Sequence, residues 1–370
     1  MKNFFRIMAL TLLLATLLCL FGGCGIIKGE DAMSYEGYVI TETMYSYWMS
    51  KIKTQFLYQY NNSKDTLTFW NTEVSEGYTY EDFIVDYIQY YAKRVLISMY
   101  LFDEYGLSFS DSQKKTIEEK LDELTLSYGG KNAFNEELGE MGLNIQTLER
   151  IYYEEAKVDC VDDYFFKSGG ILEVTDNDRE AYYKANYYCA KWIYIYTNVK
   201  LKTDEDGNYI MENGVYQYED ITDENEKQEK LNKVAQVKDR LAAGESFETV
   251  RKELTEENIG YDESLPNGIY LSNDDFETYG VDMIDALKNL EVGQYSFFDN
   301  GYATVFVKKQ PLRDYGQLTD AELEIMPYLD DYVKNEKSET FYNGFEIEIH
   351  QDVIEKYDIK TIKGSKNTTI

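Results

Sequence analysis

The hydrophobic pattern of this chain changes once, at Tyr188, and that change constrains the fold more than any other feature. Before it, apolar side chains recur every three or four positions, most clearly over residues 80–105, which indicates amphipathic helices. After it, residues 190–196 are Ala-Lys-Trp-Ile-Tyr-Ile-Tyr, a β-branched and aromatic run that favours a strand. The pattern therefore predicts an almost wholly helical first half, followed by a smaller module that mixes strands and helices.

Capping signals set the expected limits of the helices in the first half. Ser110 with Gln113, and Thr175 with Asp178, have the spacing of capping boxes. The polar residues 61–79 are expected to form a loop. The other expected elements are a short strand over residues 36–40 and helices over residues 42–60, 80–105, 110–128, 133–141, 145–166 and 175–187.

The second half contains two turn signals, Asp206-Gly207 and Asn213-Gly214, within residues 199–220. Dipeptides of this kind are typical of tight hairpins, so an inserted hairpin is expected there. The other expected elements are helices over residues 223–243, 246–254 and 281–290, closing strands over 295–298 and 302–308, and a helix over 319–334 that Pro327 interrupts.

The N-terminus has the composition of a secretory signal. Two basic residues precede an apolar run over residues 7–21, which is too short to span a bilayer as a mature helix. Two glycines and Cys24 follow and resemble a lipobox, in which the cysteine thiol receives a diacylglycerol and the chain is cut just before it. The alternative is an ordinary signal peptide with an incidental cysteine. We expect a signal peptide over residues 1–23, a lipid on Cys24, a tether over 24–33, and a place on the extracytoplasmic face of the cell membrane.

The charge of the chain restricts its partners. Sixty-eight acidic residues against 37 basic ones give a formal charge of −31, which repels nucleic acid and anionic lipid headgroups. With 44% apolar residues the chain is globular, and a single histidine, His350, disfavours imidazole-based metal sites and catalysis. We expect no cofactor, no metal and no nucleic acid partner.

Cysteine and tyrosine usage leave two questions open. Cys160 and Cys189 remain in the mature chain, and they either pair or stay as two buried thiols. The 36 tyrosines suit a surface that binds unfolded polypeptides, because the ring is large and amphipathic. The high tyrosine content is equally compatible with a general amino-acid bias of the source organism.

Four segments of the chain are more informative by their common order and spacing than any one of them is alone. They are residues 36–43 (EGYVITET), residues 93–97 with 105–111, residues 241–248 (LAAGESFE), and residues 286–293 with 300–302. Together they resemble the extracytoplasmic foldases of the SurA/PrsA group, which carry a parvulin-type peptidyl-prolyl isomerase domain. The resemblance implies a multi-domain α+β fold: a helical chaperone domain over 34–187, a parvulin-like domain over 188–312 with the hairpin 199–220 inserted, and a C-terminal helical segment over 313–370 that returns to pack on the first domain.

The chain departs from this family where catalysis is concerned. Active parvulins place one histidine at the start of the first strand and another after the Gly-Tyr of the last strand, and here Trp192 and Ala303 stand at those places. No catalytic residue is assigned. Rotation about the prolyl bond needs no nucleophile, and its barrier of about 18–20 kcal/mol falls when an apolar pocket twists the amide, so activity stays open. The resemblance implies a candidate peptide-binding groove at Trp192, Phe276, Tyr279, Met283 and Ala303, and the alternative for Trp192 is a core aromatic.

These observations favour a membrane-anchored extracytoplasmic chaperone or foldase that binds unfolded, newly exported polypeptides and lacks full isomerase activity. One alternative is an active peptidyl-prolyl isomerase that assists the folding of exported proteins. Another is a solute-binding lipoprotein, but that class needs two α/β lobes, and residues 34–187 show almost no strands. A hydrolase is disfavoured because no GxSxG or HExxH motif occurs.

Overall fold

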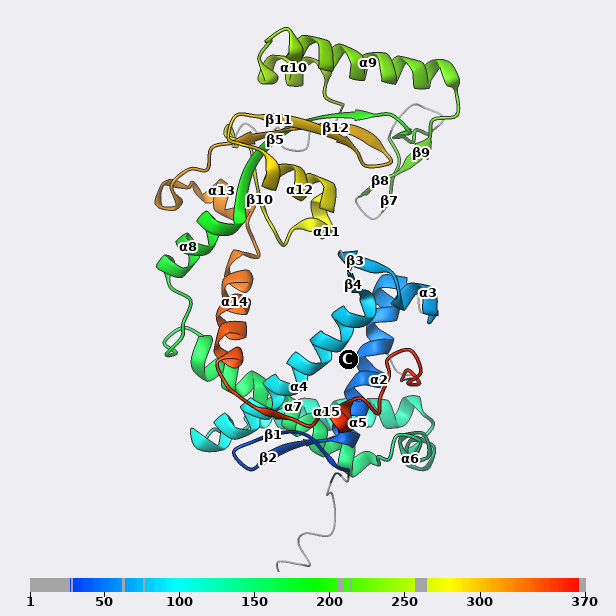
Figure 1. Ribbon diagram of the computed structural model, residues 1–370, viewed down its shortest axis with the longest axis vertical. Coiled ribbons are helices and arrows are strands. Elements are labelled where there is room, and N and C mark those ends of the chain that lie inside the picture. Colours follow the sequence, from blue (N-terminus) through cyan, green and yellow to red (C-terminus); the bar gives the residue numbers. More distant parts are fainter. Residues whose placement is uncertain are drawn as a thin grey trace, which may run out of the picture. The chain divides into compact units, whose positions relative to one another are not determined.

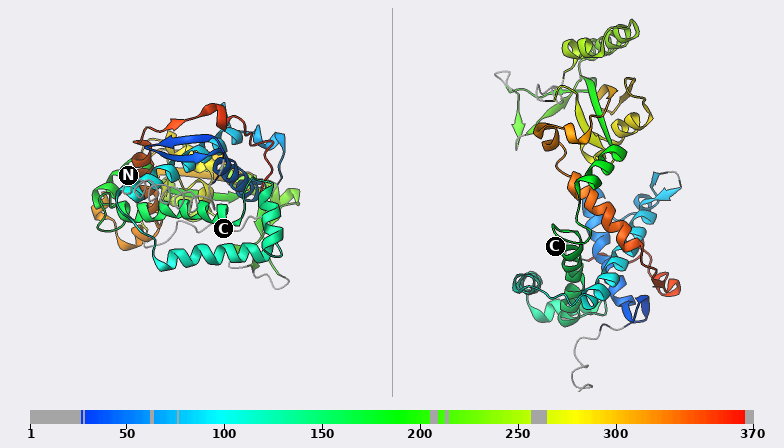
Figure 2. Two further views of the ribbon diagram at one scale, coloured as in Figure 1. Left: turned by 90° about the horizontal axis from the view of Figure 1, so that it is seen from below. Right: turned by 90° about the vertical axis from the view of Figure 1, so that its left-hand side faces the viewer.

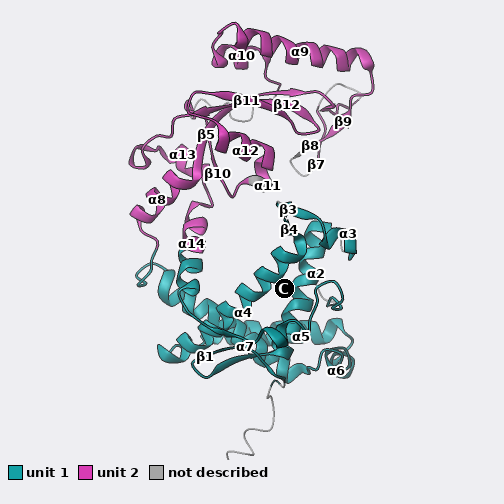
Figure 3. Cartoon of the chain, in the orientation of Figure 1, with its two compact units in different colours: residues 1–173, 337–370 teal, residues 174–336 magenta. Residues whose placement is uncertain are grey.

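The described part of the chain divides into two compact units (Figure 3). Unit 1 contains residues Met1–Glu173 and Lys337–Ile370, and unit 2 contains Val174–Glu336. The computed structural model describes residue 27 and residues 29–61, 64–75, 77–204, 209–212, 215–256 and 265–365, without the side chains of residues 215, 216, 276 and 277.

Unit 1 is mainly helical. Its elements are β1 (Asp31–Tyr35), β2 (Tyr38–Thr41), α2 (Glu42–Asn61), α3 (Leu67–Trp70), β3 (Glu73–Ser75), β4 (Tyr78–Thr79), α4 (Tyr80–Glu104), α5 (Asp111–Ser127), α6 (Lys131–Gly139), α7 (Ile145–Phe166), the last turns of α14 (Leu329–Asn343), β13 (Glu348–Ile349) and α15 (Gln351–Ile354).

A small antiparallel sheet joins the two ends of the chain in unit 1. Glu36 and Gly37 both have positive φ angles, so they form a two-residue turn that connects β1 to β2. On its other side β1 pairs with β13, in the order β13-β1-β2, so that Met33 lies opposite Ile349 (Figures 1 and 2). The C-terminal segment therefore completes a sheet that the N-terminal segment begins.

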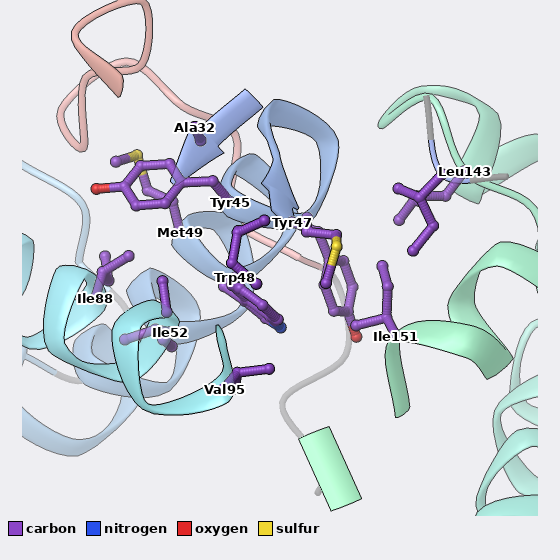
Figure 4. Packing of buried hydrophobic residues seen from close by; sticks show 14 of the residues in the cluster. Ala32, Tyr45, Tyr47, Trp48, Met49, Ile52, Ile88, Val95, Leu143 and Ile151 are labelled. Carbon is purple, nitrogen blue, oxygen red and sulfur yellow. The ribbon is translucent and has the colours of Figure 1, made fainter. Parts of the chain in front are cut away.

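The main core of unit 1 lies between this sheet and helices α2, α4, α5 and α7. Trp48 and Ile151 are fully buried in it, and Val353 and Ile359 of the C-terminal segment belong to the same cluster (Figure 4 shows its N-terminal part). Three of the long helices begin at capping boxes, α4 at Thr79, α5 at Ser110 and α7 at Asn144, and each box satisfies backbone N–H groups that the first turn leaves free.

Unit 2 mixes helices and strands. Its elements are α8 (Asp176–Asn186), β5 (Tyr187–Tyr196), β6 (Val199–Leu201), β7 (Met211–Glu212), β8 (Val215–Tyr216), β9 (Tyr218–Asp220), α9 (Glu224–Ala242), α10 (Phe247–Leu254), β10 (Ile269–Ser272), α11 (Phe276–Tyr279), α12 (Val281–Asn289), β11 (Tyr295–Asp299), β12 (Ala303–Gln310), the 3-10 turn η1 (Tyr315–Gln317), α13 (Asp320–Glu324) and the first turns of α14.

A four-stranded antiparallel sheet in the order β10-β5-β12-β11 organises unit 2, and helices cover both of its faces (Figure 1). Residues of β5 alternate between the faces: Trp192 packs toward α12, while Ile193 packs toward α9 and α10. A third cluster around Tyr183 and Tyr270 attaches α8 and the start of α14 to the sheet.

The α+β multi-domain fold class is confirmed, and most helices begin within two residues of their expected starts. Two local predictions are wrong: the loop expected over residues 61–79 contains α3 and the β3–β4 hairpin, and the tether expected over 24–33 overlaps β1. In addition, the sequence did not predict β10. Each of these elements is only two to five residues long, too short for a period to be visible.

The contact boundaries between the units also differ from the expected domain limits at residues 187 and 313. Helix α8 belongs to unit 2, because Tyr183 is fully buried against Tyr270 and Tyr315. Residues 313–336 belong to unit 2 as well, because the buried carboxylate of Glu322 is held there. Only residues from 337 onward are grouped with unit 1. Within the described residues, no helix is long and apolar enough to cross a membrane.

Candidate functional site

A cavity of about 580 Å³ lies between four helices of unit 1. These helices are α2, α4, α5 and α7, which the sequence keeps amphipathic, so that their apolar sides meet in the core and their half-buried positions face the cavity. The lining residues are Trp48, Lys51, Ile52, Gln55, Tyr87, Tyr91, Ser112, Gln113, Thr116, Ile117, Lys120, Tyr152, Glu155, Ala156, Val158 and Asp159.

Aromatic rings form much of the cavity wall. Trp48 is fully buried, and its ring meets that of Tyr91 edge to face at 5.4 Å between centroids. Tyr152 on α7 is also buried, and burial raises its pKa to about 12, so it stays a neutral phenol. Tyr87 is different because 48% of its surface is exposed, which makes it the ring that an incoming ligand can reach.

A single carboxylate, Glu155, organises the polar side of the cavity. Trp48 Nε1 donates a hydrogen bond of 2.7 Å to its Oε1, and Lys51 Nζ approaches both carboxylate oxygens at 3.2 and 3.3 Å. Burial raises the pKa of Tyr91, and the negative charge and hydrogen bond of Glu155 raise it further. The carboxylate is therefore well compensated, and it fixes Trp48 and Tyr91 in place.

Two further cavities adjoin the first. One of about 30 Å³ shares Lys51, Gln55, Lys120 and Tyr152 with it. The next, of about 340 Å³, is lined partly by the C-terminal segment that follows α15. The residues that this third cavity shares with the second are Glu137, Met141 and Ser365. We call this series of three cavities, with their lining residues, the unit 1 groove.

The C-terminal side of the unit 1 groove is held against α2 by hydrogen bonds. Ser50 Oγ donates to the Lys363 carbonyl at 2.7 Å, and the fully buried Lys53 donates to the Ile362 carbonyl at 2.8 Å. Lys53 also forms a 2.7 Å ion pair with Asp65. The last described residues are therefore part of the groove and not a free end.

The residues predicted from the parvulin resemblance lie in unit 2. Trp192, Met283 and Ala303 are 3%, 4% and 0% exposed, and all three belong to the core cluster between the sheet and α12. Tyr279 is half-buried, and its ring lies 6.1 Å from that of Trp192. The structure thus brings these four together. The side chain of Phe276, and Cys24, the expected site of the lipid, lie outside the described residues. A peptide groove at these positions stays a prediction.

The sequence led us to expect aromatic residues in the helical half but did not identify the unit 1 groove. Tyr87 and Tyr91 belong to the helical repeat over residues 80–105, and that pattern alone does not distinguish a ring in a cavity from a ring in the core. One signal was available: Lys51 and Lys120 interrupt the apolar sides of two helices, and a charged residue at such a position faces either a partner or a cavity.

The two cysteines of the described chain are free thiols. Cys189 is buried in unit 2, where burial raises its pKa to about 12, and Cys160 is half-buried in unit 1. Across the described residues, no group of three or more His, Cys, Asp or Glu side chains is placed to hold a metal ion.

A comparison with solved structures finds similar proteins. The chain is similar to PrsA foldases. It resembles peptidylprolyl isomerase PrsA of Bacillus cereus at 16% identity, covering 89% of this chain and 93% of that one with a TM-score of 0.26. It resembles foldase protein PrsA of Streptococcus pneumoniae at 15% identity, covering 90% and 93% with a TM-score of 0.23. For PrsA of Bacillus subtilis the identity is 16%, the coverage 77% and 87%, and the TM-score 0.21.

No protein-family model matches the chain, and a search of curated proteins finds no match.

Proposed function

We propose that this chain is a membrane-anchored, extracytoplasmic chaperone that binds unfolded exported polypeptides in the unit 1 groove. The observation that carries the proposal is the continuity of the groove, in which three cavities share lining residues from one to the next. An extended polypeptide needs such a continuous surface, whereas a small solute needs one enclosed pocket.

The chemistry of the groove suits a ligand without a fixed sequence. Tyrosine and tryptophan rings offer large apolar area and tolerate water at their edges, and Met141 adapts its shape to different side chains. The volume of the first cavity, about 580 Å³, lies within the range of about 300–1,000 Å³ that is usual for ligand sites. The formal charge of −31 keeps complexes with aggregation-prone chains soluble.

A light-scattering assay with a chemically denatured client tests this function. We expect the protein to suppress aggregation at stoichiometric excess, and Tyr87→Ala to raise the half-effective concentration roughly fivefold, since an exposed aromatic contact contributes about 1 kcal/mol. Tyr105→Ala is the matched control, because Tyr105 follows the same helix, is similarly exposed at 44%, and lies outside the groove. Equal effects of the two variants, or no suppression by the unaltered protein, would argue against the proposal.

We further propose that unit 2 acts as a binding or spacing module without full isomerase activity. The only histidine of the chain, His350, lies in the part of the sequence assigned to unit 1. Trp192 and Ala303 are buried, and neither carries the imidazole that active parvulins place at these positions.

A proline-limited refolding reaction tests this part of the proposal. We expect the full chain, at substoichiometric amounts, to leave the rate of the slow phase unchanged, because isomerisation takes tens to hundreds of seconds unless a site lowers its barrier. An active parvulin in a parallel reaction gives the positive control. Acceleration that scales with the concentration of the chain would favour the active isomerase instead.

The membrane anchor in this proposal is a diacylglycerol on Cys24, supported by the apolar run over residues 7–21 and the small residues before the cysteine. The mass of the mature N-terminal peptide tests it.

A further inference from the structure

We propose that Lys120 binds the carboxylate of an aspartate or glutamate side chain in the polypeptide that occupies the unit 1 groove. The inference rests on the proposed function and specifies its ligand: extended segments in which an acidic residue is flanked by apolar or aromatic ones. Lys120 would then be a charged contact to the polypeptide in a groove whose other contacts are mainly made by apolar and aromatic side chains.

The Lys120 side chain lines two of the three cavities of the groove. It is half-buried, and its ammonium lies over the Tyr152 ring at 4.6 Å from the centroid. Among the described residues it makes no ion pair and no hydrogen bond, in contrast to Lys51, which is paired with Glu155. Burial and the nearby charge of Lys51 lower the pKa of Lys120 by more than the charge of Glu155 raises it, so the charge of the Lys120 ammonium is only partly compensated.

The carboxylates that line the same two cavities compensate Lys120 only in part. Glu155 already accepts hydrogen bonds from Trp48 and Lys51. Asp159 is exposed, and Glu137 lines the second cavity but not the first. A cation that is partly desolvated and stacked on an aromatic ring favours an anionic ligand, because the ligand restores the charge balance that water supplies elsewhere.

The position of Lys120 in the groove distinguishes a side chain from a chain terminus. Lys120 lines both the first and the second cavity, so it stands where the two adjoin and not at an end of the series. A polypeptide that passes this point continues in both directions. Its carboxylate at Lys120 is therefore that of an internal residue, whereas a C-terminal carboxylate would leave one of the cavities empty.

Two capped twelve-residue peptides, identical except for glutamate or glutamine at the centre of an apolar and aromatic sequence, test the inference by fluorescence anisotropy. We expect the full chain to bind the glutamate peptide roughly fivefold more tightly at low salt, the scale of one partly exposed ion pair, with a smaller difference at 0.5 M salt. In Lys120→Met the two peptides should bind alike. Lys115→Met is the matched control, because Lys115 lies on the same helix and pairs with Glu119 away from the groove, so the preference should persist.

The outcomes separate the role of Lys120 from the chaperone function. Equal binding of both peptides to the unaltered protein overturns the role of Lys120 and leaves the chaperone proposal standing, whereas binding of neither peptide overturns both proposals.

A third peptide, with central glutamine and a free C-terminal carboxylate, tests whether the carboxylate that Lys120 binds comes from a chain end. If only this third peptide binds more tightly than the capped glutamine peptide, and if Lys120→Met abolishes the difference, the ligand is a chain end and the inference fails. If Lys120→Met folds poorly, the unaltered protein decides the question: a preference for the glutamate peptide that does not weaken at 0.5 M salt would contradict an ion pair with Lys120.

Discussion

Truncation of the chain after Gly344 is expected to unfold unit 1. The change removes β13 and the segment that follows it, which carries Val353, Ile354 and Ile359 into the main core. Burying an aliphatic side chain of this size stabilises by about 1.5–3 kcal/mol, so the loss is about 5 kcal/mol or more before any hydrogen bond is counted. Because domains of this size are stable by only about 5–15 kcal/mol, unit 1 has little left.

The hydrogen bonds lost in the truncation add to this cost. The His350 backbone N–H donates to the Ala32 carbonyl at 3.0 Å, and Lys53, which is fully buried, loses the Ile362 carbonyl that accepts its ammonium hydrogen bond. A buried lysine without all of its partners is destabilising in itself. Loss of β13 also leaves one edge of β1 without a pairing strand, although β1 still pairs with β2.

Circular dichroism and native-state hydrogen exchange measure the outcome. The truncated chain should lose protection in α2, α4 and α7, while residues 174–336 keep theirs. Point variants calibrate the effect: Ile359→Ala should cost about 3 kcal/mol, and Glu355→Ala, which changes an exposed side chain of the same segment, less than about 0.5 kcal/mol. A truncated chain with unchanged protection in unit 1 would contradict the prediction.

Glu322→Gln is expected to destabilise unit 2 by about 3 kcal/mol at neutral pH. Burial alone raises the pKa of this carboxylate, but hydrogen bonds from the Thr319 backbone, Tyr270, Asn267 and Arg313 outweigh burial and lower it to about 2, from an ordinary 4.5. Arg313 Nη1 lies 2.7 Å from one carboxylate oxygen, and Tyr270 Oη donates to the other at 3.0 Å. A depression of this size corresponds to about 3 kcal/mol of stability from the ionised form.

The same linkage fixes the pH dependence. Because the pKa of Glu322 is lower in the folded chain, its contribution is complete above about pH 4.5 and is lost as the pH falls from 4.5 toward 2. Urea unfolding of unit 2 across pH 2–7 should therefore show a steep loss below pH 4.5 that is smaller in Glu322→Gln. Glu324→Gln, an exposed position on the same helix, is the matched control. A variant with the acid sensitivity of the unaltered protein would show that other carboxylates dominate.

Local signals account for what the sequence predicted well. The capping boxes at Ser110 and Thr175 form as their spacing indicates, with the Gln113 and Asp178 side chains accepting from the backbone N–H groups of Ser110 and Thr175. The strand at residues 190–196 forms inside β5, because its aromatic and β-branched residues fit a pleated surface covered on both faces. These features depend on residues within a few positions of one another.

Features that depend on distant residues could not be predicted in the same way. The unit 1 groove is lined by Lys51, Lys120 and Tyr152, which are about a hundred residues apart from first to last, and no local pattern brings them together. Strand β10 is stable because it pairs with residues 187–190 of β5, not because its four residues favour a strand by themselves. The burial of Trp192 likewise follows from α12 covering that face of the sheet.

The use of both chain ends in unit 1 has a consequence for biogenesis. A chain that is synthesised N-terminus first presents residues 27–173 long before residues 337–365, so the β1 strand and the apolar side of α2 emerge before their C-terminal partners exist. Unit 2 is continuous in sequence and has all its parts earlier. Each nascent copy thus passes through a stage in which unit 2 is complete while unit 1 still lacks its C-terminal part.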